Sequence, residues 1–177
     1  MGHVDTFDQI EIPGRIEMAL SEIVLATELK SMALFDNEAA ARAAWAEAFR
    51  VYFEDAESNS VPIVVASLVP AEAAMEAALT GMSDSSQSGP KIQAGIQAFW
   101  GAIVPGTAWP TVTDITPPTL LSGLGDALNG VFSANTSSQL SKDDSYDAIA
   151  ASIHTNNLGG IAVWPPTPGG PGPQPIL

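Results

Sequence analysis

The sequence predicts a mainly α fold, a helical bundle-like single domain with an irregular Pro/Gly-rich extended C-terminal arm. Its 177 residues are about the length of one domain, and 46% of them are hydrophobic, enough to form a core. Apolar residues recur every three or four positions in segments that prolines and glycines separate, which indicates about six helices. We expect an extended leader at 1–14, a helical domain at 15–158 with layers at 15–82 and 90–158, and the arm at 159–177.

The first predicted layer begins with two helices. In the first, at 15–35, one face carries Ile16, Leu20, Ile23, Thr27 and Leu34, and Met18, Leu25, Leu29 and Met32 widen it. Asp36 or Asn37 can cap the second helix, because a short polar side chain accepts a hydrogen bond from the free N–H groups of the first turn. That helix is expected to end near Glu57.

A third helix is predicted at 61–82, with Asn59-Ser60 and Pro62 as its start signal. Pro70 is expected to kink or break it, because proline lacks the backbone N–H and clashes with the preceding turn. Its alanines would let a neighbouring backbone approach closely. The serine-rich segment at 83–89 is the clearest loop and separates the two layers.

The second layer begins with the clearest helical pattern in the chain. Its apolar positions are Ile92, Ile96, Phe99, Trp100 and Ile103. Pro105-Gly106 ends this helix, and 107–116 is expected to be irregular or strand-like.

Two more helices follow Pro117-Pro118. The first has three glycines, Gly123, Gly125 and Gly130, each costing about 1 kcal/mol relative to alanine, so it needs tertiary or quaternary support. The second begins at Ser141, where Asp144 gives the spacing of a capping box, and ends near Asn156-Asn157.

Composition argues against several classes of function. The formal net charge is -14 and there are only six Lys and Arg residues, so no basic patch for direct contact with nucleic acid is expected. The chain has no cysteine, which excludes disulfides, thiolate metal sites and cysteine nucleophiles. No apolar run reaches the roughly 18 residues of a membrane span, and the acidic N-terminal segment does not resemble a signal peptide.

No motif for catalysis, cofactor binding or metal binding is present in the sequence. His3 and His154 lack the partner spacing of a zinc site. The acidic group Asp143, Asp144 and Asp147 lacks the glycine and glutamate of a calcium loop and fits the first turn of a helix. We therefore predict that the protein is not an enzyme and that it has no cofactor, no metal and no small-molecule substrate.

The acidic residues are unevenly distributed. Fifteen of the twenty precede Gly89 and five follow it. The nearly neutral second half has two interpretations: a contact face for neighbouring subunits, or the better-buried half of one domain.

The predicted protein-contact residues lie in this second half and in the arm: Trp100, Trp109, Trp164, Pro165, Pro166, Ile176 and Leu177. Tryptophan is enriched among interface hot spots, although these tryptophans could instead cover the helices' own core. The arm has six prolines and three glycines in its last thirteen residues, a composition typical of extended polyproline II. It is expected either to be a disordered terminus or to lie on a neighbouring subunit and dock its Ile176-Leu177 tip.

Four segments carry a resemblance: QAFWGAI at 97–103, ITPP at 115–118, ANTSSQLS at 134–141, and AIAASIHTNNLGGIAVWPP at 148–166. Their texture resembles small virion structural proteins of tailed bacteriophages, which line the neck, tail or capsid surface. The resemblance implies a ring or lattice component that forms homo-oligomers, contacts other virion proteins, and is assembled into the virion in the host cytoplasm. The alternative is a soluble, cytoplasmic bacterial helical protein with a binding or regulatory role.

Overall fold

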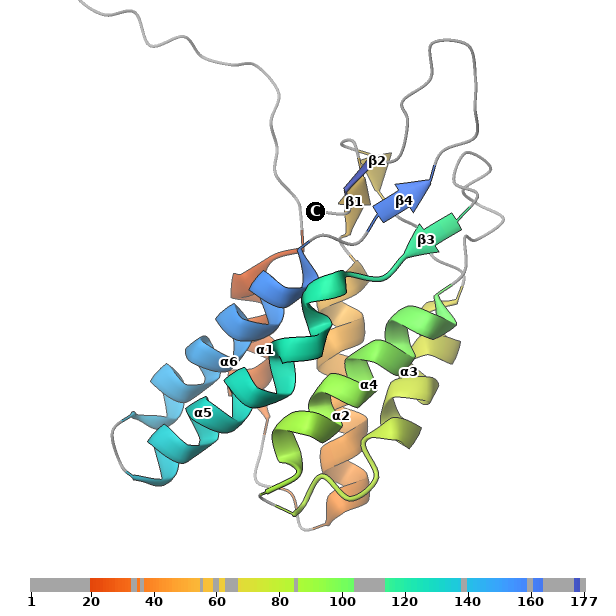
Figure 1. The fold of residues 1–177 in the computed structure, drawn as a ribbon. Coiled ribbons are helices and arrows are strands. Elements are labelled where there is room, and N and C mark those ends of the chain that lie inside the picture. The colour runs from red at the N-terminus through yellow and green to blue at the C-terminus, as the bar shows by residue number, and fades with distance from the viewer. Residues whose placement is uncertain are drawn as a thin grey trace, which may run out of the picture.

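The computed structural model describes residues 20–32, 35, 37–54, 56–58, 61–62, 67–84, 86–103, 114–137, 140–158, 161–163 and 174–175. Within these ranges the α-helices are α1 Glu22–Ser31, α2 Glu38–Glu54, α3 Leu68–Ala78, α4 Ser88–Ala102, α5 Leu124–Thr136 and α6 Lys142–Asn157. A short 3₁₀ helix, η1 Thr119–Gly123, leads into α5. The predicted mainly α fold is confirmed (Figure 1).

The helices form a closed ring. Each helix packs on the helices before and after it in the sequence, and α6 packs back on α1. Successive helices run in opposite directions (Figure 1). Because both predicted layers contribute to this ring, one core serves the whole helical part of the described chain.

Aromatic side chains fill the interior of the ring. Phe49 and Phe53 of α2 meet Phe99 and Trp100 of α4 in edge-on contacts, with ring centroids 4.8 Å apart for Phe49–Phe99 and 5.0 Å for Phe53–Trp100. Such tilted pairs add about 0.5–1.5 kcal/mol each to the free energy gained from burial. The helical periodicity of α4 was therefore a reliable guide to the side chains that it buries.

The predicted apolar face of the first helix is partly wrong. The helix begins only at Glu22, after Ser21, whose hydroxyl accepts a hydrogen bond from the backbone N–H of Val24 at 3.4 Å. Its buried side chains are Leu25, Ala26 and Leu29, whereas Ile23 is 78% exposed. The pattern counted from Ile16 misassigned the face because it continued a helical register through a segment that precedes this N-cap.

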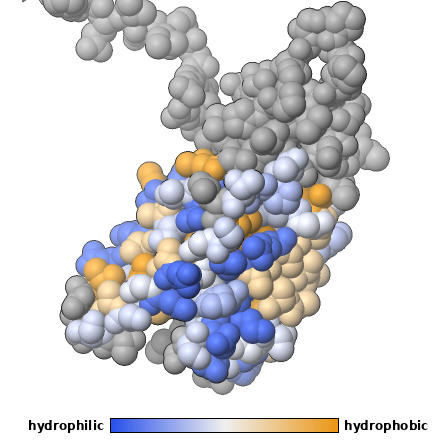
Figure 2. Space-filling model, viewed as in Figure 1, coloured by the Kyte–Doolittle hydropathy of each residue, from blue (hydrophilic) through white to orange (hydrophobic). Residues whose placement is uncertain are grey.

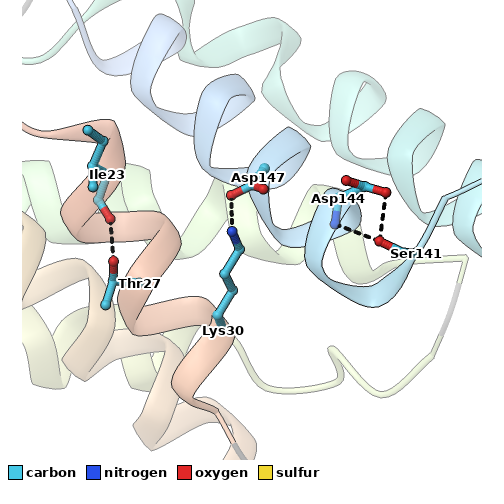
Figure 3. A network of polar contacts seen from close by, with 6 residues as sticks. All are labelled: Ile23, Thr27, Lys30, Ser141, Asp144 and Asp147. Atoms are coloured by element: carbon cyan, nitrogen blue, oxygen red, sulfur yellow. Dashed lines mark hydrogen bonds and ion pairs between the residues drawn. The ribbon is translucent and has the colours of Figure 1, made fainter.

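The N-caps predicted for the second and last helices are confirmed. The Asn37 side chain accepts a hydrogen bond from the backbone N–H of Ala40 at 2.9 Å. Ser141 accepts one from the backbone N–H of Asp144 at 3.1 Å, and its hydroxyl donates to the Asp144 carboxylate at 2.6 Å (Figure 3). Both caps satisfy backbone donors that would otherwise lack partners in the first turn.

The helix predicted at 61–82 is shorter than expected. Two-residue strands, β1 Glu57–Ser58 and β2 Val61–Pro62, pair antiparallel where the helix was expected to start. The helix α3 begins at Leu68, which places Pro70 in its first turn. The prediction of a kink at Pro70 is wrong, because a first-turn residue has no intrahelical partner for its N–H.

A small antiparallel sheet contains the strands β3 Asp114–Thr116, β4 Ile161–Val163 and β5 Gln174–Pro175, in the order β3-β4-β5. The strand-like character predicted for 107–116 is present in β3. The labelled strands lie beyond one end of the helical ring (Figure 1). Of the predicted arm, only 161–163 and 174–175 are described, and they pair with each other. The rest of the arm and the leader lie outside the described residues.

Candidate functional site

The bundle buries two polar pairs between its helices, and a catalytic site would need polar groups of this kind. Tyr52 of α2 is fully buried, and its hydroxyl lies 2.9 Å from Nδ1 of His154 on α6. Burial raises the pKa of the Tyr52 hydroxyl well above its ordinary value, and the nearby Glu22 carboxylate adds to the shift. Burial also lowers the pKa of His154 from its ordinary 6.5, and Glu22 opposes that shift. A neutral imidazole therefore faces a phenol that does not ionise, which suits a structural hydrogen bond between α2 and α6.

Trp100 belongs to a second buried polar pair. Its indole N–H donates to the Asn157 side-chain oxygen at 2.6 Å, and the Asn157 amide donates to the Ile153 carbonyl oxygen at 2.8 Å. Trp100 is only 1% exposed, so its assignment as a protein-contact residue is corrected: it covers the helices' own core. The other predicted contact residues, Trp109, Trp164, Pro165, Pro166, Ile176 and Leu177, lie outside the described residues, and their role stays a prediction.

Two of the three acidic residues that the sequence groups on the last helix take part in polar contacts. Asp144 takes part in the N-cap of α6, and the Asp147 carboxylate pairs with the Lys30 ammonium of α1 at 2.5 Å (Figure 3). The hydrogen bond to Asp147 raises the pKa of Lys30 above its ordinary value. Among the residues that the structure describes, no group of three or more His, Asp or Glu side chains could hold a metal ion.

An uncharged surface lies across α3 and α4. We call it the small-residue face, and its residues are Val69, Ala73, Ala77, Ala94, Ala98 and Gly101, all exposed or partly exposed. Val69, the largest of these side chains, is 70% exposed. Figure 2 shows a pale apolar area where Figure 1 places these two helices. On a chain with a net charge of -14, an exposed face without charged residues is a distinct feature.

The charged residues of α3 and α4 lie at the borders of this face. Glu72 is on the flank of α3 that turns toward α2, where its carboxylate pairs with Arg50 at 2.8 Å, and Glu76 follows one turn later. In α4 the charged residue is Lys91, in the first turn, three residues before Ala94 and therefore at one end of the face. Short side chains would allow another backbone to approach both helices closely.

Two glycines of α4 show that small residues serve two purposes. A Cβ on Gly95 would lie 3.0 Å from a methyl of Leu79, so this glycine lets α3 and α4 pack together. A Cβ on Gly101 would meet no atom within 4 Å. Packing inside the described chain therefore does not require glycine at 101, although glycine costs up to about 1 kcal/mol relative to alanine in a helix.

Sequence reasoning located this face only in part. The alanines of α3 were recognised as allowing close approach, and α4 belongs to the nearly neutral second half. The sequence did not predict that α3 and α4 lie side by side, because that placement depends on the closed ring of helices. The signal that could have located the face is the helical spacing of small residues in two successive segments.

Comparison with known proteins gives no relative: no family model, curated protein or solved structure matches this chain. In the part of the chain that is described, none of the helices combines the length and the apolar character needed to cross a bilayer.

Proposed function

We propose that this chain is a non-enzymatic structural assembly protein of a bacteriophage virion, which oligomerises and contacts neighbouring subunits. The observation that carries the proposal is the small-residue face of α3 and α4, exposed and uncharged on a strongly acidic chain. Depletion of charge at the centre of a contact area is a general feature of protein interfaces. The second half of the chain and its C-terminal arm are proposed to supply further contacts.

The use of the buried polar side chains supports the same proposal. The pairs Tyr52–His154 and Trp100–Asn157 each join two helices through a hydrogen bond between their side chains. A chain whose internal polar groups are occupied in holding helices together is suited to a scaffold. The place in a virion rests on the resemblance of texture to small virion structural proteins.

The proposal is tested by adding a charge to the face. Ala73→Lys puts an ammonium in the middle of the exposed side of α3, and lysine has a helix propensity close to that of alanine. Ala43→Lys, on the exposed side of α2, makes the same change of charge away from the face and serves as the matched control. Sedimentation of both variants and of the unchanged chain should show loss of the oligomer for Ala73→Lys alone.

Two results would count against the proposal. If the two lysine variants dissociate to the same degree, net charge and not the face governs assembly. If the unchanged chain is a monomer at all concentrations, the small-residue face does not join copies of this chain. The alternative, a helical protein with a binding or regulatory role, then becomes the better interpretation.

A further inference from the structure

A hollow of 220 Å³ lies between the end of α1 and the middle of α2. Its apolar floor is made by Met32, Ala44 and Ala48, of which Met32 and Ala48 are buried. Phe35, 37% exposed, lines one side. This volume is below the roughly 300–1,000 Å³ of pockets for drug-sized ligands, so the hollow suits a single side chain more than a cofactor.

Two carboxylates from different helices line the same hollow. Glu28 comes from α1 and Glu47 from α2. Glu28 has no ion pair with any residue that the structure describes, and Glu47 has only Arg50, at the limiting distance of 4.0 Å. The Arg50 guanidinium pairs more closely with Glu54 and with Glu72 than with Glu47.

The nearest basic residue along α1 does not neutralise this site. Lys30 points to α6, where its ammonium pairs with Asp147 (Figure 3). The hollow therefore combines an apolar floor, an aromatic side and carboxylates whose charge is not balanced by a dedicated cation of the described chain.

This combination matches an amphipathic cation. Arginine and lysine bury an aliphatic stem while their charged heads stay in a polar environment, and a cation beside an aromatic ring gains further attraction. The planar guanidinium of arginine can donate to two carboxylates at once, which a lysine ammonium does less specifically.

We infer that the hollow between α1 and α2 binds an arginine side chain presented by a basic segment of a partner protein. The stem lies on Met32 and Ala48 beside Phe35, and the guanidinium lies between Glu28 and Glu47. The net charge of -14, with most acidic residues in the first half of the chain, attracts such a basic segment before it docks.

The inference goes beyond the proposed assembly function and does not depend on it. The hollow lies between α1 and α2, whereas the small-residue face lies on α3 and α4. Binding of an arginine derivative can be measured on the full chain whether or not that chain forms oligomers.

The test is a titration of the full chain with N-acetyl-L-argininamide, followed by backbone amide NMR. Signals of Phe35, Ala44 and Ala48 are expected to shift together. N-acetyl-L-citrullinamide, which has nearly the same shape without the charge, should leave them unchanged. Each carboxylate at the rim should contribute about fivefold in affinity, the order of an exposed ion pair.

Variants distinguish binding of arginine in the hollow from general attraction to the acidic surface. The double variant Glu28→Gln/Glu47→Gln should weaken arginine binding by about tenfold or more. Asp126→Asn/Asp143→Asn removes the same charge from exposed positions on α5 and α6 and should change the affinity by less than about twofold. Ala44→Leu, which fills the hollow, should also abolish the shifts.

The inference is overturned if both double variants weaken binding equally, if the shifts spread over the acidic surface, or if the citrulline derivative binds as well as the arginine derivative. Thermal unfolding of each variant shows whether the fold is intact. Because the altered carboxylates lie at the surface, a folded Glu28→Gln/Glu47→Gln variant that still binds arginine fully is also a contradiction.

Discussion

The contact between α4 and α5 includes Gly89, in the first turn of α4, where the structure leaves no room for a larger side chain. An added Cβ at position 89 would lie 2.3 Å from the carbonyl oxygen of Gly125 and 2.5 Å from the side-chain oxygen of Asn129. The first of these atoms belongs to the backbone, so a change of rotamer cannot relieve the clash. Gly89→Ala must therefore move one helix away from the other.

The expected cost follows from three contributions. Overpacking costs about 1–3 kcal/mol. Separation of the helices also weakens the hydrogen bond from the Gly89 N–H to the Asn129 side chain, 3.1 Å long, which contributes about 0.5–1.5 kcal/mol. The higher helix propensity of alanine returns up to about 1 kcal/mol. The net effect is a loss of about 1–3 kcal/mol in the free energy of unfolding.

Gly130→Ala is the matched control, because it is the same substitution in α5 where a Cβ would meet no atom within 4 Å. It should stabilise the chain by up to about 1 kcal/mol. Urea unfolding of both variants measures these values, and each 1 kcal/mol corresponds to about 2–4 °C in Tm for a chain of this size. A Gly89→Ala variant as stable as the unchanged chain would refute the close contact of α4 and α5.

Two further predictions concern the buried polar pairs. Trp100→Phe removes the N–H that donates to the fully buried Asn157 side chain, so urea unfolding should show a loss of about 1–3 kcal/mol in the free energy of unfolding. The loss should be larger than for the control Trp45→Phe, at a half-buried position, and an equal loss for both would contradict the role of the hydrogen bond. The pKa of His154 is lower in the folded chain than in the unfolded chain, so on acidification the imidazole binds a proton in the unfolded chain first. The free energy of unfolding should therefore fall as pH drops from 7 through 6.5 toward the folded pKa. His154→Gln should remove this slope, and identical pH profiles for the two chains would disprove the assignment.

The parts of the fold that sequence predicted well are those set by local chemistry. Asn37 and Ser141 cap their helices because a short polar side chain meets N–H groups only three residues away. The buried face of α4 followed from its spacing of large apolar residues. These features depend on few distant contacts.

The predictions that were wrong concern segments whose local pattern fits two structures equally well. Val61-Pro62 suits a first helical turn as well as a short strand, and pairing with Glu57-Ser58 decided for the strand. Trp100 fits an interface as well as a core, and the position of Asn157 on a distant helix decided for the core. Its partner is 57 residues away in the chain, which periodicity does not reveal.

The candidate contact surfaces were harder to predict, because each needs two helices placed side by side. The small-residue face requires that α3 and α4 be neighbours, which the glycine at 95 permits. The hollow brings Glu28 and Glu47 together from α1 and α2. In the sequence these glutamates are two among many acidic residues of the first half, and nothing distinguishes them.

The solution mass of the full chain tests the central claim most directly. Light scattering should be carried out from micromolar to near-millimolar concentration, together with a chain that ends at Trp164. An assembly protein should have a mass of several chains, and the shortened chain should assemble less completely if the arm joins the copies. The mass of one chain at every concentration, with no difference between the two lengths, would contradict self-assembly through the small-residue face and the arm.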